Sequence, residues 1–432
     1  MQRIALMDFK IKYKKCTYEE FLALKPMKHI KPVAPNLFWR SLAWILSVPD
    51  LKGANFKYKK IGMERLGKNE PALFLMNHSS FLDFEIVMHT LWPRKVNIVT
   101  GMGGCICKEW VMRQVGCIPT RKFTTDISLI KDIKYCLEKL KTSVLMYPEA
   151  DYSYSGRSHT LPSSVAMLVK RLGVPLVMIE SFGAFIHDPT YCNLGNRDTP
   201  VNAEVRYLLS PQEIEQMSVE EIDTLIRREF SFDGFRWQQE NGIVVNTPNR
   251  THCLEKILYK CPHCHSEGKT EGTGIRLVCH ACNKEWELTE LGFMKAVSGE
   301  TEFDHIPDWV EWQRECVRQE IIDGQFGYDV PINLYAMVNT KALYILGDGR
   351  LSYDVKGARV IGYDGKIDFY KKSMSMYAIG ADLHWTNVGD GICFGDNKVT
   401  YLAVPCHDSH LVMKSRLASE EIYKLLKGGN NQ

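Results

Sequence analysis

The sequence predicts an α/β domain that is followed by a small cysteine-rich module and a β-rich domain. Between residues 57 and 209, short apolar runs alternate with helical stretches, which is typical of a largely parallel sheet covered by helices. Two CxxC pairs lie within residues 253–290, and after Val330 short β-rich runs are separated by Gly-Asp turns. A chain of 432 residues that is 45% hydrophobic and 24% charged suits several folded domains and excludes a fibrous or disordered protein.

Residues 1–56 predict a basic amphipathic segment. Residues 1–60 contain 13 Lys and Arg against 4 Asp and Glu, although the net charge of the whole chain is only +3. Asn36 can cap a helix, LFWRSLAWILSV, that ends before Pro49. Such a helix suits either the protein core or a membrane interface, where Arg40 and the flanking lysines would meet anionic lipid headgroups.

Nothing in the sequence indicates a membrane-spanning or secreted protein. No apolar run reaches the roughly 18–20 uncharged residues that a spanning helix needs. Met1–Lys15 has Asp8 and several lysines where a secretory signal has an apolar stretch. We therefore expect a cytoplasmic protein, bound peripherally to the inner face of a membrane if the basic segment contacts lipid.

The α/β domain is expected over residues 57–250. Ligands of such sheets bind beyond the carboxyl ends of the strands, so polar residues that follow strands are the candidates for a site. An acidic helical segment at 211–240 is expected to close the domain. Apolar runs predict buried strands at 71–76, 96–100, 143–147 and 174–180, and helices are expected at 81–92 and 127–141.

The segment NHSSFLD, directly after the first of these strands, carries a possible catalytic pair. His78 and Asp83 are five residues apart and would lie roughly 140° apart on one helix, so they can meet only if His78 lies on the preceding turn. Ser79 or Ser80 would then cap the helix, with Asp83 in its first turns. The carboxylate could accept a hydrogen bond from Nδ1 and leave Nε2 free to take a proton from a hydroxyl group. Alternatively, His78 is an ordinary polar residue of a loop.

Three further segments follow in order: a glycine-to-basic segment from Gly116 to Lys122, the segment YPEADYS at 147–153, and an apolar strand after Gly173. With the HxxxxD segment, these four blocks resemble the lysophospholipid and glycerol-phosphate acyltransferase family over about residues 70–180. The resemblance implies a mixed sheet flanked by helices and direct attack of a substrate hydroxyl on an acyl thioester. In that reaction His78 would be the general base and Asp83 would orient it.

The second and third blocks imply the site of the acceptor's polar head, and they depart from the family pattern. Lys122 replaces an arginine and would meet a phosphate as a point charge. Tyr152 stands where a phosphate-binding arginine is expected and Ala150 replaces a glycine, so an unusual acceptor such as a glycolipid or amino-lipid is also considered. Glu149 could bind acceptor hydroxyls or Arg121, or form a buried structural ion pair. The expected acceptor-binding or phosphate-binding residues are Gly116, Arg121, Lys122, Glu149 and Arg157.

The cysteine-rich module at 253–290 predicts a structural zinc site. Cys261 and Cys264 form one CxxC knuckle and Cys279 and Cys282 another, and four thiolates fill a tetrahedral zinc ion. The glycines between the knuckles suit a hairpin. Zinc ribbons also occur in nucleic-acid-binding proteins, but this one has no basic stripe, so we expect no nucleic-acid partner.

The remaining sequence predicts a helical connector at 291–325 and a β-rich domain with a terminal helix at 326–432. The β-rich domain resembles a pleckstrin-homology or GRAM-type sandwich in its architecture, and a plain interaction or packing module is the alternative.

The expected function is transfer of a fatty acyl chain from acyl-CoA or acyl carrier protein to a hydroxyl of a lysophospholipid, such as 1-acylglycerol-3-phosphate. The alternative is a catalytically silent lipid-binding scaffold or sensor that uses the zinc ribbon to recruit partners.

Overall fold

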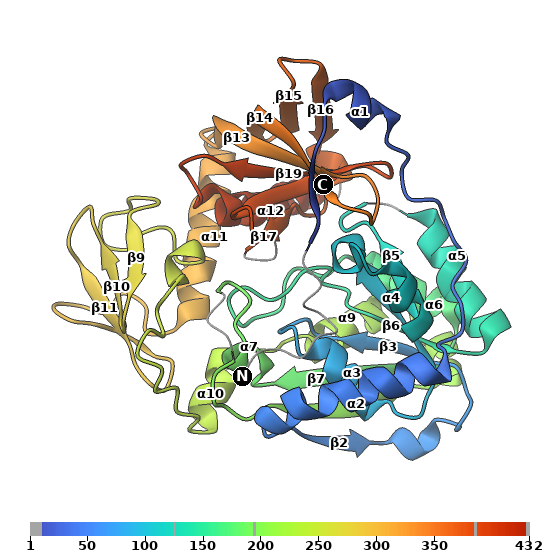
Figure 1. Cartoon of the computed structure of the whole chain (residues 1–432). Coiled ribbons are helices and arrows are strands. Elements are labelled where there is room, and N and C mark those ends of the chain that lie inside the picture. The colour runs from blue at the N-terminus through green and yellow to red at the C-terminus, as the bar shows by residue number, and fades with distance from the viewer. Residues whose placement is uncertain (1–10, 125, 193–195, 384–386, 429–432) are drawn as a thin grey trace.

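The computed structural model describes residues 11–124, 126–192, 196–383 and 387–428. The described chain forms a seven-stranded, a four-stranded and an eight-stranded sheet. In Figure 1 the α/β domain is blue and green, the cysteine-rich module is yellow, and the β-rich domain is orange and red. The predicted mixed α/β domain and the β-rich domain that follows it are both confirmed.

The seven-stranded sheet has the strand order β2-β8-β7-β3-β6-β4-β5. The five strands from β7 to β5 are parallel, whereas β8 is antiparallel to β7 and parallel to β2. Residues that follow β3, β4, β5 and β6 therefore meet at one edge of the sheet. The strands are β2 (Lys57–Ile61), β3 (Leu73–Met76), β4 (Val96–Gly101), β5 (Cys117–Thr120), β6 (Ser143–Met146), β7 (Leu176–Phe182) and β8 (Asn202–Leu209).

Helices cover both faces of this sheet. Alternate residues of β3 face opposite cores: Phe74 and Met76 pack with α2, α3 and α4, and Leu73 and Leu75 pack with α5, α6 and α9. The helix expected at 127–141 is α5 followed by a π-helical turn. The helices of the domain are α2 (Leu37–Gly53), α3 (Asp83–Thr90), α4 (Glu109–Val115), α5 (Ile127–Tyr135), α6 (Ser164–Leu172), α7 (Ala184–His187), α8 (Pro211–Gln216), α9 (Val219–Glu229) and α10 (Gly234–Glu240).

The amino-terminal segment differs from the prediction of a separate docking segment. Strand β1 (Tyr13–Lys15) pairs in parallel with β14 (Leu343–Asp354), so these residues belong to the sheet of the C-terminal domain. After α1 (Tyr18–Ala23) the chain runs past α5 to α2, as the blue ribbon in Figure 1 shows. Residues 1–10 of the predicted segment lie outside the described residues.

Helix α2 is partly buried and partly exposed. Asn36 caps it through hydrogen bonds to the N–H groups of Phe38 and Trp39, as the sequence predicted. The helix continues through Pro49, because the lost backbone hydrogen bond is offset by burial of Leu51 in the following turn. Within the described chain, no helix has both the length and the apolar character needed to cross a membrane.

Arg40 does not face solvent, which corrects the expectation that it meets lipid headgroups. Its guanidinium is buried, donates to the carbonyl oxygen of Pro93 at 3.1 Å and lies 5.0 Å from the centre of the Trp92 ring. Elsewhere on its surface, α2 exposes Leu37, Phe38 and Ile45.

The cysteine-rich module is an antiparallel sheet with the strand order β12-β11-β10-β9. It extends beyond the predicted boundary at residue 290, because β12 adds to the edge strand β11. Helix α11 (Ile306–Ile322) then connects it to the C-terminal domain. The strands are β9 (Thr270–Thr273), β10 (Arg276–Cys279), β11 (Glu285–Leu288) and β12 (Met294–Ala296).

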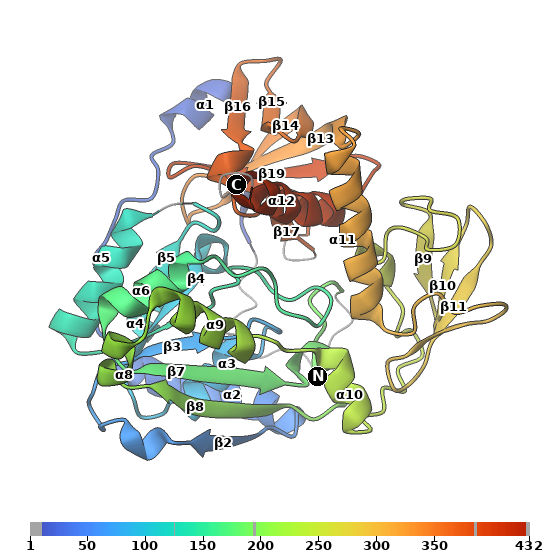
Figure 2. The ribbon, with the colours of Figure 1, turned by 180° about the vertical axis from the view of Figure 1, so that it is seen from behind.

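The C-terminal domain has two antiparallel runs of strands that meet where β13 pairs with both β14 and β19. Helix α12 (Leu411–Gly428) closes the domain and packs beside α11 (Figure 2). A buried carboxylate on α12, Glu420, joins Arg314 of α11 at 2.7 Å. The other strands are β13 (Gly327–Met337), β15 (Gly357–Gly362), β16 (Ile367–Lys372), β17 (Gly380–Asp382), β18 (Gly391–Gly395) and β19 (Thr400–Pro405).

Candidate active site

The structure brings His78 and Asp83 together at the carboxyl edge of the seven-stranded sheet. Nδ1 of His78 lies 2.7 Å from Oδ2 of Asp83. Neither serine caps α3, in contrast to the prediction, because Leu82 occupies the N-cap position without a side-chain cap. Instead, the backbone N–H groups of Ser79 and Ser80 donate to Oδ2 of Asp83 at 2.8 and 3.2 Å. The carboxylate therefore fixes both the turn and the imidazole.

The backbone of His78 is held by the segment that follows β6. Its N–H donates to Oε2 of Glu149 at 2.9 Å, and its carbonyl oxygen accepts from the N–H of Ser153 at 2.7 Å. Oε1 of Glu149 accepts from the N–H of His159 at 2.8 Å. Glu149 thus accepts from two backbone amides, and Arg121, which the sequence offered as its partner, bonds the C-terminal domain instead.

Two tyrosine rings enclose the imidazole. The ring centroid of Tyr147 lies 4.1 Å and that of Tyr152 lies 3.8 Å from the centroid of His78. The ring plane of His78 is therefore fixed from both sides, while 14% of its side chain stays exposed. With Nδ1 engaged by Asp83, Nε2 is the nitrogen left to meet a substrate proton.

Burial governs the protonation of this group of residues. Burial lowers the pKa of His78 well below its usual value, and the nearby ammonium of Lys122 lowers it further. Burial also raises the pKa of Asp83, while the two amide hydrogen bonds act in the opposite direction. The pKa of Glu149 rises to about 7 because its carboxyl is buried, although the amides of His78 and His159 oppose the shift. The imidazole is consequently neutral at physiological pH, as a general base must be.

A largely apolar cavity of about 430 Å³ lies beside His78. Its walls come from the ends of β4, β5 and β6, from α4, α5 and α6, and from the C-terminal domain. Apolar side chains on these walls are Phe81, Phe84, Ile98, Val99, Met102, Met112, Leu129, Met146, Val165 and Leu168. An apolar chain is therefore a suitable occupant of this space.

Two of the predicted acceptor-binding residues, Gly116 and Arg157, have structural roles instead. Gly116 ends α4 with a φ of +112°, and a Cβ there would approach Pro35 Cγ to 2.6 Å and Val96 O to 2.9 Å. It precedes β5 and therefore lies at the opposite edge of the sheet from His78. Arg157 bonds Asp233 at 2.7 Å and Asp308 at 2.9 Å, which ties the α/β domain to α10 and α11. Neither residue is placed to bind an acceptor.

Arg121 and Lys122 both line the cavity, but only Lys122 presents a charge to it. The guanidinium of Arg121 is buried and donates four hydrogen bonds to the C-terminal domain. Nζ of Lys122 lies 2.8 Å from Oδ1 of Asp151 and 5.9 Å from the ring centre of Tyr152. Lys122 keeps 39% of its side chain exposed.

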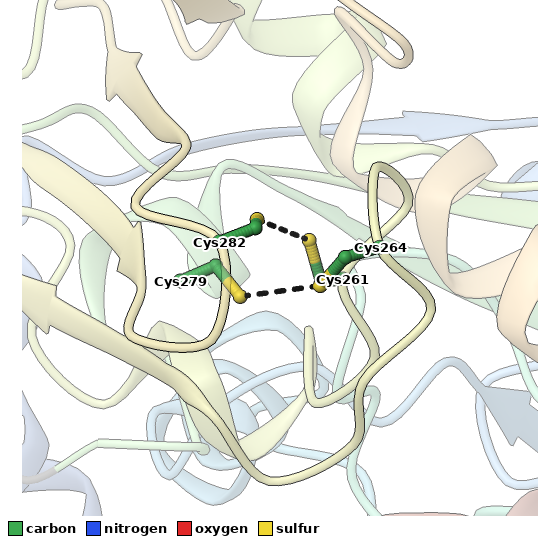
Figure 3. Close-up of side chains that lie close together, drawn as sticks. All are labelled: Cys261, Cys264, Cys279 and Cys282. Carbon is green, nitrogen blue, oxygen red and sulfur yellow. Dashed lines mark hydrogen bonds between the residues drawn. The ribbon is translucent and has the colours of Figure 1, made fainter.

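The four knuckle cysteines converge at one point, as Figure 3 shows. Their sulfur atoms lie within 4.8 Å of one another, with Sγ–Sγ distances of 3.8 Å for Cys261–Cys282 and 3.7 Å for Cys264–Cys279. Four thiolates at about 2.3 Å from a tetrahedral zinc ion would be spaced by roughly 3.8 Å. The spacing and the donor set therefore fit zinc.

Several residues of the site were missed in the sequence. Tyr147 and Tyr152 enclose the imidazole, Asp151 pairs with Lys122, and Asp188 accepts a hydrogen bond from Ser80 Oγ at 3.1 Å. Their common signal is a position shortly after a strand on the carboxyl side of the sheet. The structure also brings Cys192, His252 and Cys253 within 4.8 Å, a group that no sequence spacing suggested.

The fold and the site define a class of protein: an α/β domain that presents a neutral, carboxylate-oriented histidine beside an apolar cavity. The Acyltransferase family model matches residues 57–180, the part of the chain that contains the histidine, the aspartate and the later blocks. Residues 57–180 therefore form a domain of the acyltransferase family.

Sequence relatives agree with this assignment. The chain is 28% identical over 125 residues to the 1-acyl-sn-glycerol-3-phosphate acyltransferase BAT2, chloroplastic, of Brassica napus, which covers 28% of this chain and 36% of the relative. It is 28% identical over 131 residues to 1-acyl-sn-glycerol-3-phosphate acyltransferase LPAT1, chloroplastic, of Arabidopsis thaliana, covering 30% of this chain and 36% of the relative. The chain thus spans about a third of the length of these relatives.

A solved structure was also found, the 1-acyl-sn-glycerophosphate acyltransferase PlsC from Thermotoga maritima. It aligns with a TM-score of 0.32 and 15% identity, over 44% of this chain and 77% of that chain.

Proposed function

We propose that the protein transfers a fatty acyl chain from a thioester donor, acyl-CoA or acyl carrier protein, to a hydroxyl of a lysophospholipid. The observation that carries the proposal is the 2.7 Å contact between His78 and Asp83 beside the apolar cavity. The assignment of residues 57–180 to the acyltransferase family and the similarity to two plant 1-acyl-sn-glycerol-3-phosphate acyltransferases support it.

In this mechanism Nε2 of His78 takes the proton of the acceptor hydroxyl as its oxygen attacks the thioester carbonyl. The C–O bond forms, and the C–S bond breaks as the tetrahedral intermediate collapses. The proton then passes from His78 to the departing thiolate. Asp83 keeps Nδ1 protonated and stabilises the imidazolium that forms between the two proton transfers. The acyl chain occupies the apolar cavity, and the enzyme needs no nucleophile of its own.

The acceptor's head group is assigned to Lys122. Arg121 and Arg157 are engaged elsewhere and Tyr152 lies on the imidazole, so Lys122 is the cation of the second and third blocks that can meet an anionic group. A lysophosphatidic acid or another lyso-lipid with an anionic head would satisfy it. An ammonium group alone would not.

The experiment is an acyl-transfer assay with the full chain, acyl-CoA or acyl carrier protein as donor, and vesicles that contain one lyso-lipid at a time. Thiol release and lipid product are measured together. We expect His78→Ala to lower kcat/KM by roughly 10²–10⁴-fold, the usual contribution of a general base. His407→Ala, which removes an exposed histidine of the C-terminal domain, is the matched control and should retain full activity. Full transfer by the His78→Ala variant, or no transfer by the unsubstituted protein to any lyso-lipid, refutes the proposal.

We further propose that the cysteine module binds one structural zinc ion through Cys261, Cys264, Cys279 and Cys282. The tetrahedral sulfur spacing supports it. The ion would cross-link the two knuckles of a small sheet, and it has no place in the acyl-transfer chemistry.

Peripheral binding to the inner face of an anionic membrane, from the cytoplasmic side, completes the proposal. Leu37 and Phe38 of α2 are 66% and 65% exposed and Trp110 of α4 is 63% exposed. The ring of Trp39 lies 5.3 Å from that of its neighbour Phe38 and 5.5 Å from that of Trp110, and the second contact joins α2 to α4. An exposed aromatic, apolar surface suits the headgroup boundary of a bilayer. The seven antiparallel strands and closing helix of the C-terminal domain support a likeness to pleckstrin-homology or GRAM domains.

A further inference from the structure

The cavity beside His78 has walls from two domains. Besides the strand ends of the α/β domain, it is lined by Met337, Tyr377, Gly380–Leu383, Cys393 and Thr400, all of the C-terminal domain. The family match ends at residue 180, so this wall is outside the matched region. The C-terminal domain is therefore in a position to affect which acceptor the site binds.

Residues 121–123 are held by the C-terminal domain on either side of Lys122. Arg121 donates to the carbonyl oxygens of Met337, Val338 and Lys398 at 2.7–2.9 Å and to the hydroxyl of Thr400 at 3.2 Å. Phe123 adopts the left-handed conformation, with a φ of 54°. Its ring lies 4.9 Å from the guanidinium of Arg416 and 5.4 Å from the ring of Tyr377. Lys122, between these two anchors, points back to Asp151.

The partner of Lys122 is fixed by the same domain. Oδ1 of Asp151 pairs with Lys122, while Oδ2 lies 3.7 Å from Nη1 of Arg416 and 3.4 Å from the N–H of Ala381. Arg416 is itself buried and bonds Glu420 at 2.9 Å. Burial would raise the pKa of Asp151, but Lys122 and Arg416 lower it, so the carboxyl is ionised. Asp151 therefore has a second cation and can release Lys122 to an anionic ligand without becoming unpaired.

We propose that the C-terminal domain forms the head-group half of the acceptor site, with Arg121 and Phe123 as positioning residues that aim Lys122 at the anionic head of the acceptor. This inference rests on the proposed function for the identity of the acceptor. When Asp151 pairs with Arg416 instead of Lys122, the ammonium group of Lys122 becomes available to bind one anionic group. The substrate class is a lyso-lipid whose head carries a negative charge near the reacting hydroxyl.

The test is a double-mutant cycle on acceptor binding, measured calorimetrically with a soluble short-chain 1-acylglycerol-3-phosphate and the full chain. We expect Lys122→Ala to weaken binding by roughly tenfold or more, the effect of losing one charge-assisted contact. Arg121→Gln should weaken it comparably in the unsubstituted protein and hardly at all when Lys122 is already alanine, because Arg121 acts through Lys122. Arg350→Gln removes an exposed arginine of the same domain that pairs with Asp329, and it should leave binding unchanged.

If Arg121→Gln does not fold, Thr400→Val removes one of the four anchoring hydrogen bonds and should show the same dependence on Lys122 at a smaller scale. The proposal is overturned if Arg121→Gln, or Thr400→Val in its place, weakens acceptor binding equally in the presence and in the absence of the Lys122 side chain. It is also overturned if the unsubstituted protein does not bind the acceptor. Binding that shows the expected coupling without acyl transfer refutes the proposed function and leaves this inference standing.

Discussion

Glu149→Gln tests how one buried carboxylate holds the turn that carries His78. The two oxygens of Glu149 accept hydrogen bonds from the N–H groups of His78 and His159 at 2.9 and 2.8 Å. A glutamine amide has a single acceptor oxygen, so its NH2 group must face one of these donors. One buried N–H then loses its partner, which costs about 1–3 kcal/mol of stability.

The loss of stability caused by Glu149→Gln should become smaller as the pH rises. Burial raises the pKa of Glu149 from 4.5 to about 7 in the folded protein, so the folded state binds more protons than the unfolded state between these values. The unsubstituted protein therefore loses stability as the pH rises from 4.5 to 7. At 1.36 kcal/mol per pKa unit, the loss between pH 5 and pH 8 is about 2–3 kcal/mol. The glutamine side chain of the variant does not titrate, so the stability gap between the two proteins should narrow by this amount.

Urea unfolding of both proteins at pH 5, 6, 7 and 8 measures the gap. Glu138→Gln, at an exposed position of the π-helical turn after α5, is the matched control and should change stability by less than about 0.5 kcal/mol at every pH. A gap between Glu149→Gln and the unsubstituted protein that stays constant from pH 5 to pH 8 would refute the titration argument. If Glu149→Gln and the unsubstituted protein have the same free energy of unfolding at pH 5, the hydrogen-bond argument is refuted.

Three further predictions concern the metal, the base and the membrane. Cys279→Ser should reduce the zinc content, measured by elemental analysis, from one ion per chain to none. The control Cys406→Ser, at an exposed cysteine outside the cluster, should keep one ion. Zinc retained by the Cys279→Ser variant contradicts the four-thiolate site. Burial and the charge of Lys122 lower the pKa of His78, so the acidic limb of the pH profile of kcat/KM should lie below pH 6.5. The limb should move to higher pH in Lys122→Met. A limb at or above pH 6.5 in the unsubstituted protein contradicts this prediction. Phe38→Ser should reduce the fraction of protein that sediments with anionic vesicles severalfold. Ile322→Ser, at an exposed apolar position on α11, should leave that fraction unchanged. An equal loss of sedimentation in both variants argues against a membrane-binding surface on α2.

The strands and helices around the site were predictable because their apolar patterns are local. The run at 71–76 is buried on both faces, and β3 occupies its last four residues. The HxxxxD spacing requires a turn between the two residues, and that turn brings His78 to Asp83. The four cysteines were predictable for the same reason, since each CxxC knuckle places two sulfurs on one side of a turn.

Contacts between distant segments were not predictable. The basic segment at 121–122 contains two adjacent cations, and nothing in the local sequence separates a ligand-binding charge from one that binds backbone carbonyls 216–277 residues away. Strand β1 was missed because three residues are too short for a pattern, and its partner β14 lies more than 300 residues later. The extension of α2 through Pro49 depends on burial of Leu51, a tertiary effect that overrides the local rule.

The departures from the family's acceptor motifs and the added domain have one physical explanation. A guanidinium that satisfies three carbonyl groups at an interface cannot also bind a phosphate, so Arg121 is committed to the interface wherever the C-terminal domain is docked. We propose that the acceptor charge meets the neighbouring Lys122 instead, which lies between two residues anchored by that same interface. Removal of the C-terminal domain would free the guanidinium of Arg121, but it would also remove the groups that anchor residues 121–123, so neither cation would be aimed at an acceptor. It would expose the cavity wall, free the chain at 121–123 and leave Asp151 as the only fixed partner of Lys122 among the described residues.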